Sequence, residues 1–228
     1  MMNINNFASK CHLLYKDIGD IKSWVWPIDD HQTFDLIVYD YFATIRPLLE
    51  KQFGNAKDGV VIQAGGNCGV YPLLYTEFFS SVYTFEPDPL NFYCLVNNCQ
   101  FPQIIKFNAA LSDKSELLSI ENVIPSNRGM IKVNNIGSNK CIQSMTIDSL
   151  ELENVKFIQL DIEGFEVNAL NGAEKTINKY KPLILLESGD ANNPVNFQQI
   201  KNTDEKMKSF NYKSMGHINR LDVLYTPN

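Results

Sequence analysis

Carboxylates stand directly after three apolar segments of the sequence, and they are the side chains best suited to chemistry. The segments are residues 82–85, 155–160 and 183–186, and the acids that follow them are Glu86, Asp161, Glu163 and Glu187. Because the carboxyl ends of parallel strands meet at one crevice, we expect these acids to lie near one another. Asp161 and Glu163 are two residues apart at a strand end, which predicts that both point the same way.

An acid in such a crevice can take a proton from a hydroxyl group, so Asp161 and Glu163 are the predicted catalytic residues. In an alternative interpretation, these two acids and Glu187 hold Mg²⁺, which prefers oxygen ligands. A side-chain base is the favoured interpretation, and no metal is predicted. A further candidate base is His217, in the expected turn between the last two strands, although a lone histidine in a turn is more often part of the surface.

Three other polar residues have simpler explanations. Glu166 opens a helix, where the helix dipole favours an acid whether or not it takes part in chemistry. His12 and His31 are interpreted as surface residues.

A glycine-rich turn lies between the first expected strand, residues 60–64, and the helix after it. Gly65, Gly66 and Gly69 lie in this turn, and apolar residues recur with helical period from Val70 onward. Glycines let a ligand come close to backbone amides and to the positive end of the helix. Glu86 follows Gly69 by seventeen residues, where a ribose-binding carboxylate stands in a dinucleotide-type βαβ unit. These features predict a nucleoside-binding crossover.

The elements that must position these residues alternate between strand and helix. Strands are expected at residues 60–64, 82–85, 103–107, 155–160 and 183–186, followed by an antiparallel pair at 212–216 and 221–226. The fold class predicted is α/β, with a doubly wound, mostly parallel, Rossmann-like sheet of seven strands whose last strand is antiparallel. A small β excursion is expected around residues 113–145, with a loop at 126–129 and 134–139.

The chain is expected to be a single domain with an N-terminal extension. Residues 1–55 would form a cap packed on the core, and residues 56–228 the ligand-binding domain. The extension has an aromatic stretch at Trp24 and Trp26, interpreted as covering core. A helix is expected at residues 40–53 with a kink or a restart at Pro47, and residues 33–39 fit either strand or helix.

Composition excludes several classes of partner. The net charge is −6 and only three of the 228 residues are arginine, which argues against nucleic acid. Five cysteines without a C-x-x-C pair predict free thiols in a reducing compartment, and no signal peptide or membrane span is recognisable. The protein is therefore expected in the cytoplasm, away from membranes, with a small-molecule partner. The oligomeric state stays open.

Three blocks of sequence resemble the FkbM family of S-adenosylmethionine-dependent methyltransferases, across roughly residues 57–188. The blocks are residues 61–69 with 84–88, residues 108–112, and residues 145–150 with Asp161-Ile162-Glu163-Gly164-Phe165-Glu166. The resemblance implies bound S-adenosylmethionine and methyl transfer to a hydroxyl of a small polyol, sugar or natural product. The cofactor-binding residues it implies are Gln63, Gly65, Gly66, Asn67, Gly69, Glu86, Asn108, Ala109, Ala110 and Asp161.

Two residues depart from the family pattern. Gln63 stands where an acid is common in the family, and Gln159 where a lysine is common. Because Gln63 carries no charge, the negative charge that stabilises a cationic sulfonium would come from another residue, such as Asp161. Two rival functions stay open. One is a catalytically silent nucleoside-binding or scaffold protein, and the other is an NAD-dependent oxidoreductase, for which the full G-x-G-x-x-G spacing is missing.

Overall fold

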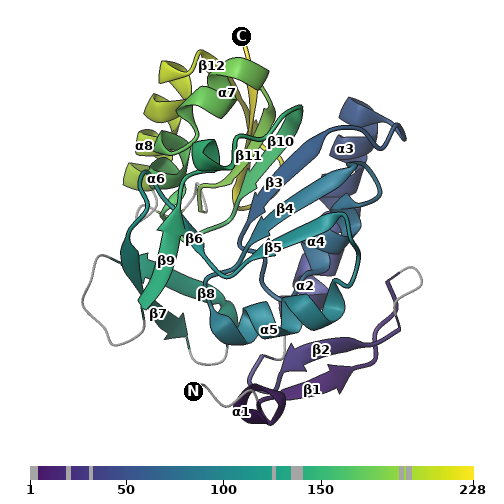
Figure 1. Ribbon diagram of the computed structural model, residues 1–228. Helices are drawn as coiled ribbons and strands as arrows, with labels where there is room; N and C mark the ends of the chain where they lie inside the picture. Colours follow the sequence, from purple (N-terminus) through teal and green to yellow (C-terminus); the bar gives the residue numbers. More distant parts are fainter. Residues whose placement is uncertain are drawn as a thin grey trace.

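The computed structural model describes residues 5–18, 22–30, 33–124, 127–134, 141–189, 193 and 197–228. Its centre is a seven-stranded sheet in the order β12-β13-β11-β10-β3-β4-β5 (Figure 1). The strands are β3 (Val60–Ala64), β4 (Ser81–Phe85), β5 (Ile104–Phe107), β10 (Val155–Leu160), β11 (Leu183–Glu187), β12 (Tyr212–His217) and β13 (Asp222–Pro227). Neighbours from β11 to β5 pair in parallel, and β13 pairs antiparallel to β11 and β12. The predicted doubly wound sheet is therefore confirmed.

Helices cover both faces of this sheet because successive strand residues point to opposite sides. Val61 and Phe157 join one apolar cluster, and their neighbours Ile62 and Ile158 join the other. The first face is covered by α2 (Thr33–Asp40), η1 (Tyr41–Ile45), α3 (Arg46–Phe53), α4 (Val70–Tyr75) and α5 (Pro89–Asn98). The second is covered by α6 (Glu166–Asn171), α7 (Glu174–Tyr180) and α8 (Phe197–Ser209).

The N-terminal elements pack on the first face of the sheet. They begin with α1 (Asn5–Ala8) and the hairpin of β1 (Cys11–Leu14) and β2 (Trp24–Pro27), which lies beside α5 (Figure 1). Trp24 and Trp26 are buried and pack edge-on against Phe34, so they cover core as predicted. Residues 33–39, which fitted either strand or helix, lie in helix α2.

A π-helical turn lies immediately before the helix that contains Pro47, the residue at which the sequence predicted a kink or a restart. It spans Tyr41–Ile45 and leads directly into α3, whose second residue is Pro47. Proline has no N–H to donate into the preceding turn, and a wider turn accommodates the missing bond.

The expected β excursion forms a second sheet beside the C-terminal ends of the parallel strands. Its strands are β6 (Ala110–Leu111), β7 (Leu117–Ile124), β8 (Asn127–Asn134) and β9 (Cys141–Met145), in the order β6-β9-β7-β8, followed by η2 (Ile147–Leu150). The loop predicted at residues 126–129 and 134–139 is wrong for 127–129 and 134, because these residues belong to β8, where Asn127 pairs with Ile124 of β7. Residues 126 and 135–139 lie outside the described residues. β8 also lies against α2, so the excursion and the N-terminal region meet.

No helix in the described part of the chain combines the length and the apolar character that a membrane crossing needs.

Candidate cofactor and active site

The glycines of the turn after β3 are required by close packing inside the protein. A Cβ on Gly65 would lie 2.1 Å from the carbonyl oxygen of Asp161, and one on Gly69 would lie 2.5 Å from the Sγ of Cys99. Both glycines also have positive φ, at +85° and +98°. At Gly66, a Cβ would lie 2.7 Å from a methyl carbon of Leu95. Close packing therefore explains why these residues are glycine, and their part in cofactor binding stays a prediction.

The backbone amides of this turn are all used within the protein. The N–H groups of Gly65 and Gly66 donate to the carbonyl of Phe85, and that of Gly69 donates to Gly66. The N–H of Asn67 donates to Glu86 at 2.7 Å, and that of Cys68 donates to the Asn67 side chain at 2.6 Å. A pyrophosphate would need such amides as donors. The turn therefore suits a ligand without phosphate groups better than it suits NAD.

Glu86 is the buried acid that organises this turn. Its two carboxylate oxygens accept hydrogen bonds from the N–H groups of Asn67 and Asp88, at 2.7 and 2.8 Å. Burial and the nearby Asp88 raise the pKa of Glu86 to about 8, although the two amides oppose the shift. Each oxygen keeps lone-pair capacity for a ligand hydroxyl. Asp88 in turn caps α5 by accepting from two of its amides at 2.9 Å.

The two glutamines that depart from the family pattern form buried hydrogen bonds. The Gln63 amide donates to the carbonyl of Gly65 at 2.8 Å and accepts from the Thr84 hydroxyl at 2.6 Å. Gln159 accepts from the hydroxyl of Tyr75 on α4. A carboxylate at position 63 could not donate to Gly65, so glutamine suits this packing.

The residues after β5 line the far side of the same region. The Asn108 amide donates to the carbonyls of Glu86 and Pro87, at 2.9 and 3.2 Å, and so braces the turn after β4. Ala109 and Ala110 are buried beside it.

Asp161, Glu163 and Glu187 form an acid cluster. One carboxylate oxygen from each lies within 4.8 Å of the others, and all three residues are partly exposed. The prediction that Asp161, Glu163 and Glu187 converge is confirmed, and Glu86, which was expected near them, is not part of the cluster. Neighbouring strand ends place Asp161 and Glu187 as predicted, but the reason given for Glu163 is wrong. β10 ends at Leu160, and Glu163 sits in a turn with φ of +55°, so this turn and not strand alternation places it beside Asp161.

The acid cluster has an unusual charge balance. In the described part of the chain, no lysine or arginine forms an ion pair with Asp161 or Glu187. Burial and the charges of Asp161 and Glu163 raise the pKa of Glu187 far above its ordinary value. Burial also raises the pKa of Asp161, while a hydrogen bond with Glu187 lowers it. At neutral pH the pair therefore shares a proton, and the cluster offers oxygen ligands suited to an organic cation or a divalent metal.

A hydrogen-bond network joins the last hairpin, beside the acid cluster, to the N-terminal region. Asp222 pairs opposite Glu187 in the sheet, and its carboxylate accepts from the Asn219 amide at 2.7 Å. Asn219 also donates to Asp40 at 2.8 Å, and Asp40 accepts from the Tyr71 hydroxyl at 2.7 Å. Sequence reasoning missed these residues, because Asp40 lies in a region without a recognised motif.

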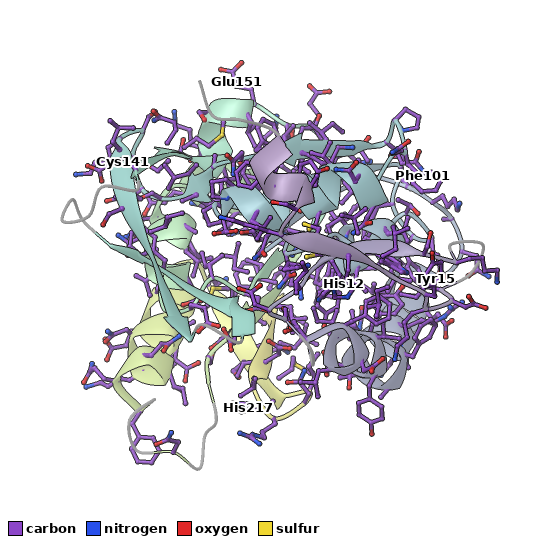
Figure 2. All side chains as sticks on the ribbon, turned by 90° about the horizontal axis from the view of Figure 1, so that it is seen from below. His12, Tyr15, Phe101, Cys141, Glu151 and His217 are labelled. Atoms are coloured by element: carbon purple, nitrogen blue, oxygen red, sulfur yellow. The ribbon has the colours of Figure 1, made fainter. Side chains whose placement is uncertain are left out.

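The remaining candidates have structural or surface positions. The side chain of Glu166 is buried and accepts from the amides of Ile162 and Gly164, both at 3.2 Å, so it holds the turn that carries Glu163. His217 is exposed at the end of β12 and points away from the molecule in Figure 2, and His12 lies half-buried on β1. His31 lies outside the described residues.

A family model of the methyltransferase FkbM domain matches residues 67–214, about two thirds of the chain. The chain belongs to the FkbM methyltransferase domain family. The matched region of this FkbM-family protein holds Glu86, the acid cluster and the second sheet. None of the curated proteins matches the chain in sequence.

Solved structures confirm the class I methyltransferase fold. The methyltransferase FkbM from Methylobacillus flagellatus KT aligns with a TM-score of 0.51 at 19% identity, over 82% of this chain and 49% of that protein. A putative transferase from Pyrococcus horikoshii aligns with a TM-score of 0.50 at 12% identity, over 96% of this chain and 73% of that one. The FkbM-family chain thus spans about half the length of the Methylobacillus protein.

Proposed function

We propose that this FkbM-family protein is an S-adenosylmethionine-dependent O-methyltransferase. Its acceptor would be a hydroxyl of a small polyol, sugar or natural product, and its place of action the cytoplasm. The observation that carries the proposal is the acid cluster, which lies at the carboxyl ends of the central strands within a methyltransferase fold.

The residues of the turn fit this cofactor by their chemistry. Glu86 offers two acceptor oxygens for ribose hydroxyls, and the acid cluster offers negative charge to a cationic sulfonium. The amides that a dinucleotide phosphate would require are already used, which favours S-adenosylmethionine over the NAD-dependent alternative. When bound, S-adenosylmethionine supplies an electrophilic methyl group on sulfur.

The chain's own groups would hold the acceptor and take its proton. Glu187 keeps the proton that it shares with Asp161, because their mutual hydrogen bond raises the pKa of Glu187 and lowers that of Asp161. Asp161 and Glu163 are then the carboxylates available to accept a hydrogen bond from the acceptor hydroxyl and to remove its proton. The closeness of their oxygens allows one acceptor hydroxyl to reach both.

A metal role for the same acids predicts a different response. If the three carboxylates held Mg²⁺, the ion would lower the pKa of the hydroxyl, and dialysis against a chelator would abolish turnover until Mg²⁺ was returned. If they act as a side-chain base, turnover survives the chelator. We propose the side-chain base.

A panel of sugars and polyols, incubated with S-adenosylmethionine carrying a labelled methyl group, tests the proposal by mass spectrometry. We expect at least one acceptor to gain a single labelled methyl group on oxygen. Asp161→Asn and Glu163→Gln should lower kcat on that acceptor by about 10²-fold or more with little change in cofactor affinity. Lys213→Gln, on the exposed edge strand β12, is the matched control and should retain turnover.

Two outcomes would contradict the proposal. Cofactor binding without methylation of any acceptor in the panel would favour the catalytically silent binding protein. Methylation that survives in both amide variants would remove the two acids from the mechanism.

A further inference from the structure

Three cysteines from different parts of the chain meet beside the glycine turn. Cys11 lies on β1, Cys94 on α5 and Cys68 within the turn itself. The sulfur atoms of Cys11 and Cys94 are 3.5 Å apart, and Cys94 is also hydrogen-bonded to Cys68. None of the five cysteines of the chain is in a disulfide bond. None of these thiols has a role in the proposed methyl transfer.

The contact between Cys11 and Cys94 joins the N-terminal hairpin to the helix beside the turn. Asn98, one turn further along α5, makes the neighbouring contacts. Its amide accepts from the N–H of Val25 on β2 at 2.7 Å and donates to the carbonyl of Val25 at 2.9 Å. The same amide donates to the carbonyl of Cys68 at 2.8 Å. The docking of the hairpin is therefore linked to the glycine turn by direct hydrogen bonds.

We propose that Cys11 and Cys94 form a redox-sensitive dithiol, which latches the β1–β2 hairpin to α5 when a low-molecular-weight disulfide oxidises it. A sulfur separation of 3.5 Å is about 1.5 Å longer than a disulfide bond, so a small side-chain movement closes it. Cys11 is half-buried and can be reached by a small oxidant, whereas Cys94 and Cys68 are fully buried. Among Cys11, Cys68 and Cys94, Cys11 is therefore the thiol that reacts first.

The reaction proceeds in two exchanges. The Cys11 thiolate attacks one sulfur of the small disulfide, forming a mixed disulfide and releasing one small thiolate. Cys94 then gives up its proton and attacks the Cys11 sulfur, which forms the protein disulfide and releases the second small thiolate. This exchange is the slow step: although the hydrogen bond with Cys11 lowers the pKa of Cys94, the hydrogen bond with Cys68 and burial raise it well above its ordinary value. Two protein thiols are oxidised and one small disulfide is reduced. The two thiol protons pass through solvent to the two leaving thiolates.

The test oxidises the reduced full-length protein with glutathione disulfide and then alkylates the remaining thiols. We expect Cys11 and Cys94 to be missing from the alkylated cysteines, no glutathione retained on either of them, and a cross-linked peptide pair that contains both; glutathione on the exposed Cys141 has no bearing on the latch. Hydrogen exchange at the Val25 amide should slow by at least about 10-fold, because the latch holds the hairpin on Asn98. Tm should rise by roughly 5–15 °C, because the bond closes a loop of more than 80 residues.

Cys141→Ser provides the matched control, because Cys141 is exposed on β9 and far from the hairpin in Figure 2. This variant should form the same cross-link, whereas Cys11→Ala should form none and should keep the Tm of the reduced protein within a few degrees. Glutathione retained on Cys11 with Cys94 still alkylated would overturn the proposal. A cross-link to Cys68, or a Cys11–Cys94 bond that leaves exchange at Val25 unchanged, would overturn it equally.

Discussion

Replacing Glu86 with alanine separates its structural role from its proposed role in cofactor binding. The carboxylate is 4% exposed and accepts from two backbone amides, at 2.7 and 2.8 Å. Leaving a buried donor without a partner costs about 1–3 kcal/mol. Water that enters the vacated space offsets part of this cost, so we expect a loss of roughly 2–4 kcal/mol in the free energy of unfolding. For a chain of this size, Tm should fall by about 5–15 °C.

The same substitution should weaken S-adenosylmethionine binding. At pH 9, where Glu86 with its pKa of about 8 is mostly ionised, hydrogen bonds from ribose hydroxyls to its carboxylate are charge-assisted and contribute roughly 1.5–3 kcal/mol, which corresponds to a 10- to 100-fold loss in affinity. Isothermal titration calorimetry at a temperature where the variant is folded measures this loss, and urea titration measures the stability.

Asp88→Ala is the control for this prediction. Asp88 lies two residues away and caps α5 through the amides of Leu90 and Asn91. Its loss should cost about 0.5–2 kcal/mol of stability and leave cofactor affinity within about threefold. The ribose assignment would be refuted by Glu86→Ala protein that binds with wild-type affinity, or by an equal loss of affinity in Asp88→Ala.

Three further predictions concern the turn and its buried acids. Gly69→Ala should lower the free energy of unfolding by about 2–4 kcal/mol, because the residue has positive φ and the new Cβ clashes with Cys99. In urea titrations, adding Cys99→Ala should restore part of this loss. If the losses of the two single variants simply add in the double variant, the clash is excluded. Burial raises the pKa values of Glu86, Glu166 and Asp222 to about 8, 7 and 7. The folded state therefore holds protons that the unfolded chain has released, and the free energy of unfolding should rise as pH falls from 8 to 5, by about 1.4 kcal/mol per pH unit for each proton; a flat profile would contradict these shifts. Glu166→Ala should lower Tm by several degrees and leave cofactor affinity within threefold, whereas a selective loss of binding would assign Glu166 to the ligand.

Most of the central sheet was predictable because its pattern is local. The β-branched run at Val60 and Val61, the acids at strand ends and the Asp88-Pro89 helix start each indicate an element within a few residues. The family motifs lie on the same segments. Strand pairing and helix coverage then follow from the alternation of buried residues.

The features that were missed depend on contacts between distant segments. Asp40 meets Tyr71 and Asn219 only because helix α2 packs on α4 and beside the final hairpin, and the pattern of residues 33–40 is ambiguous on its own. The convergence of the acids was predicted, but the turn that places Glu163 requires a positive φ at a non-glycine residue, which sequence periodicity does not indicate.

The roles of the glycines were also predictable only in part. Sequence spacing identified the turn, but it could not show that Asp161 and Cys99 occupy the space beside Gly65 and Gly69. Close packing and ligand approach select the same residue type, so the motif alone does not distinguish them.

Calorimetric titration with S-adenosylmethionine, with NAD as the comparator, tests the central claim most directly. The account predicts that S-adenosylmethionine binds one site per chain and that NAD does not bind, because the amides of the turn are already used by the protein. Saturable binding of NAD without binding of S-adenosylmethionine, or binding of neither, would contradict it.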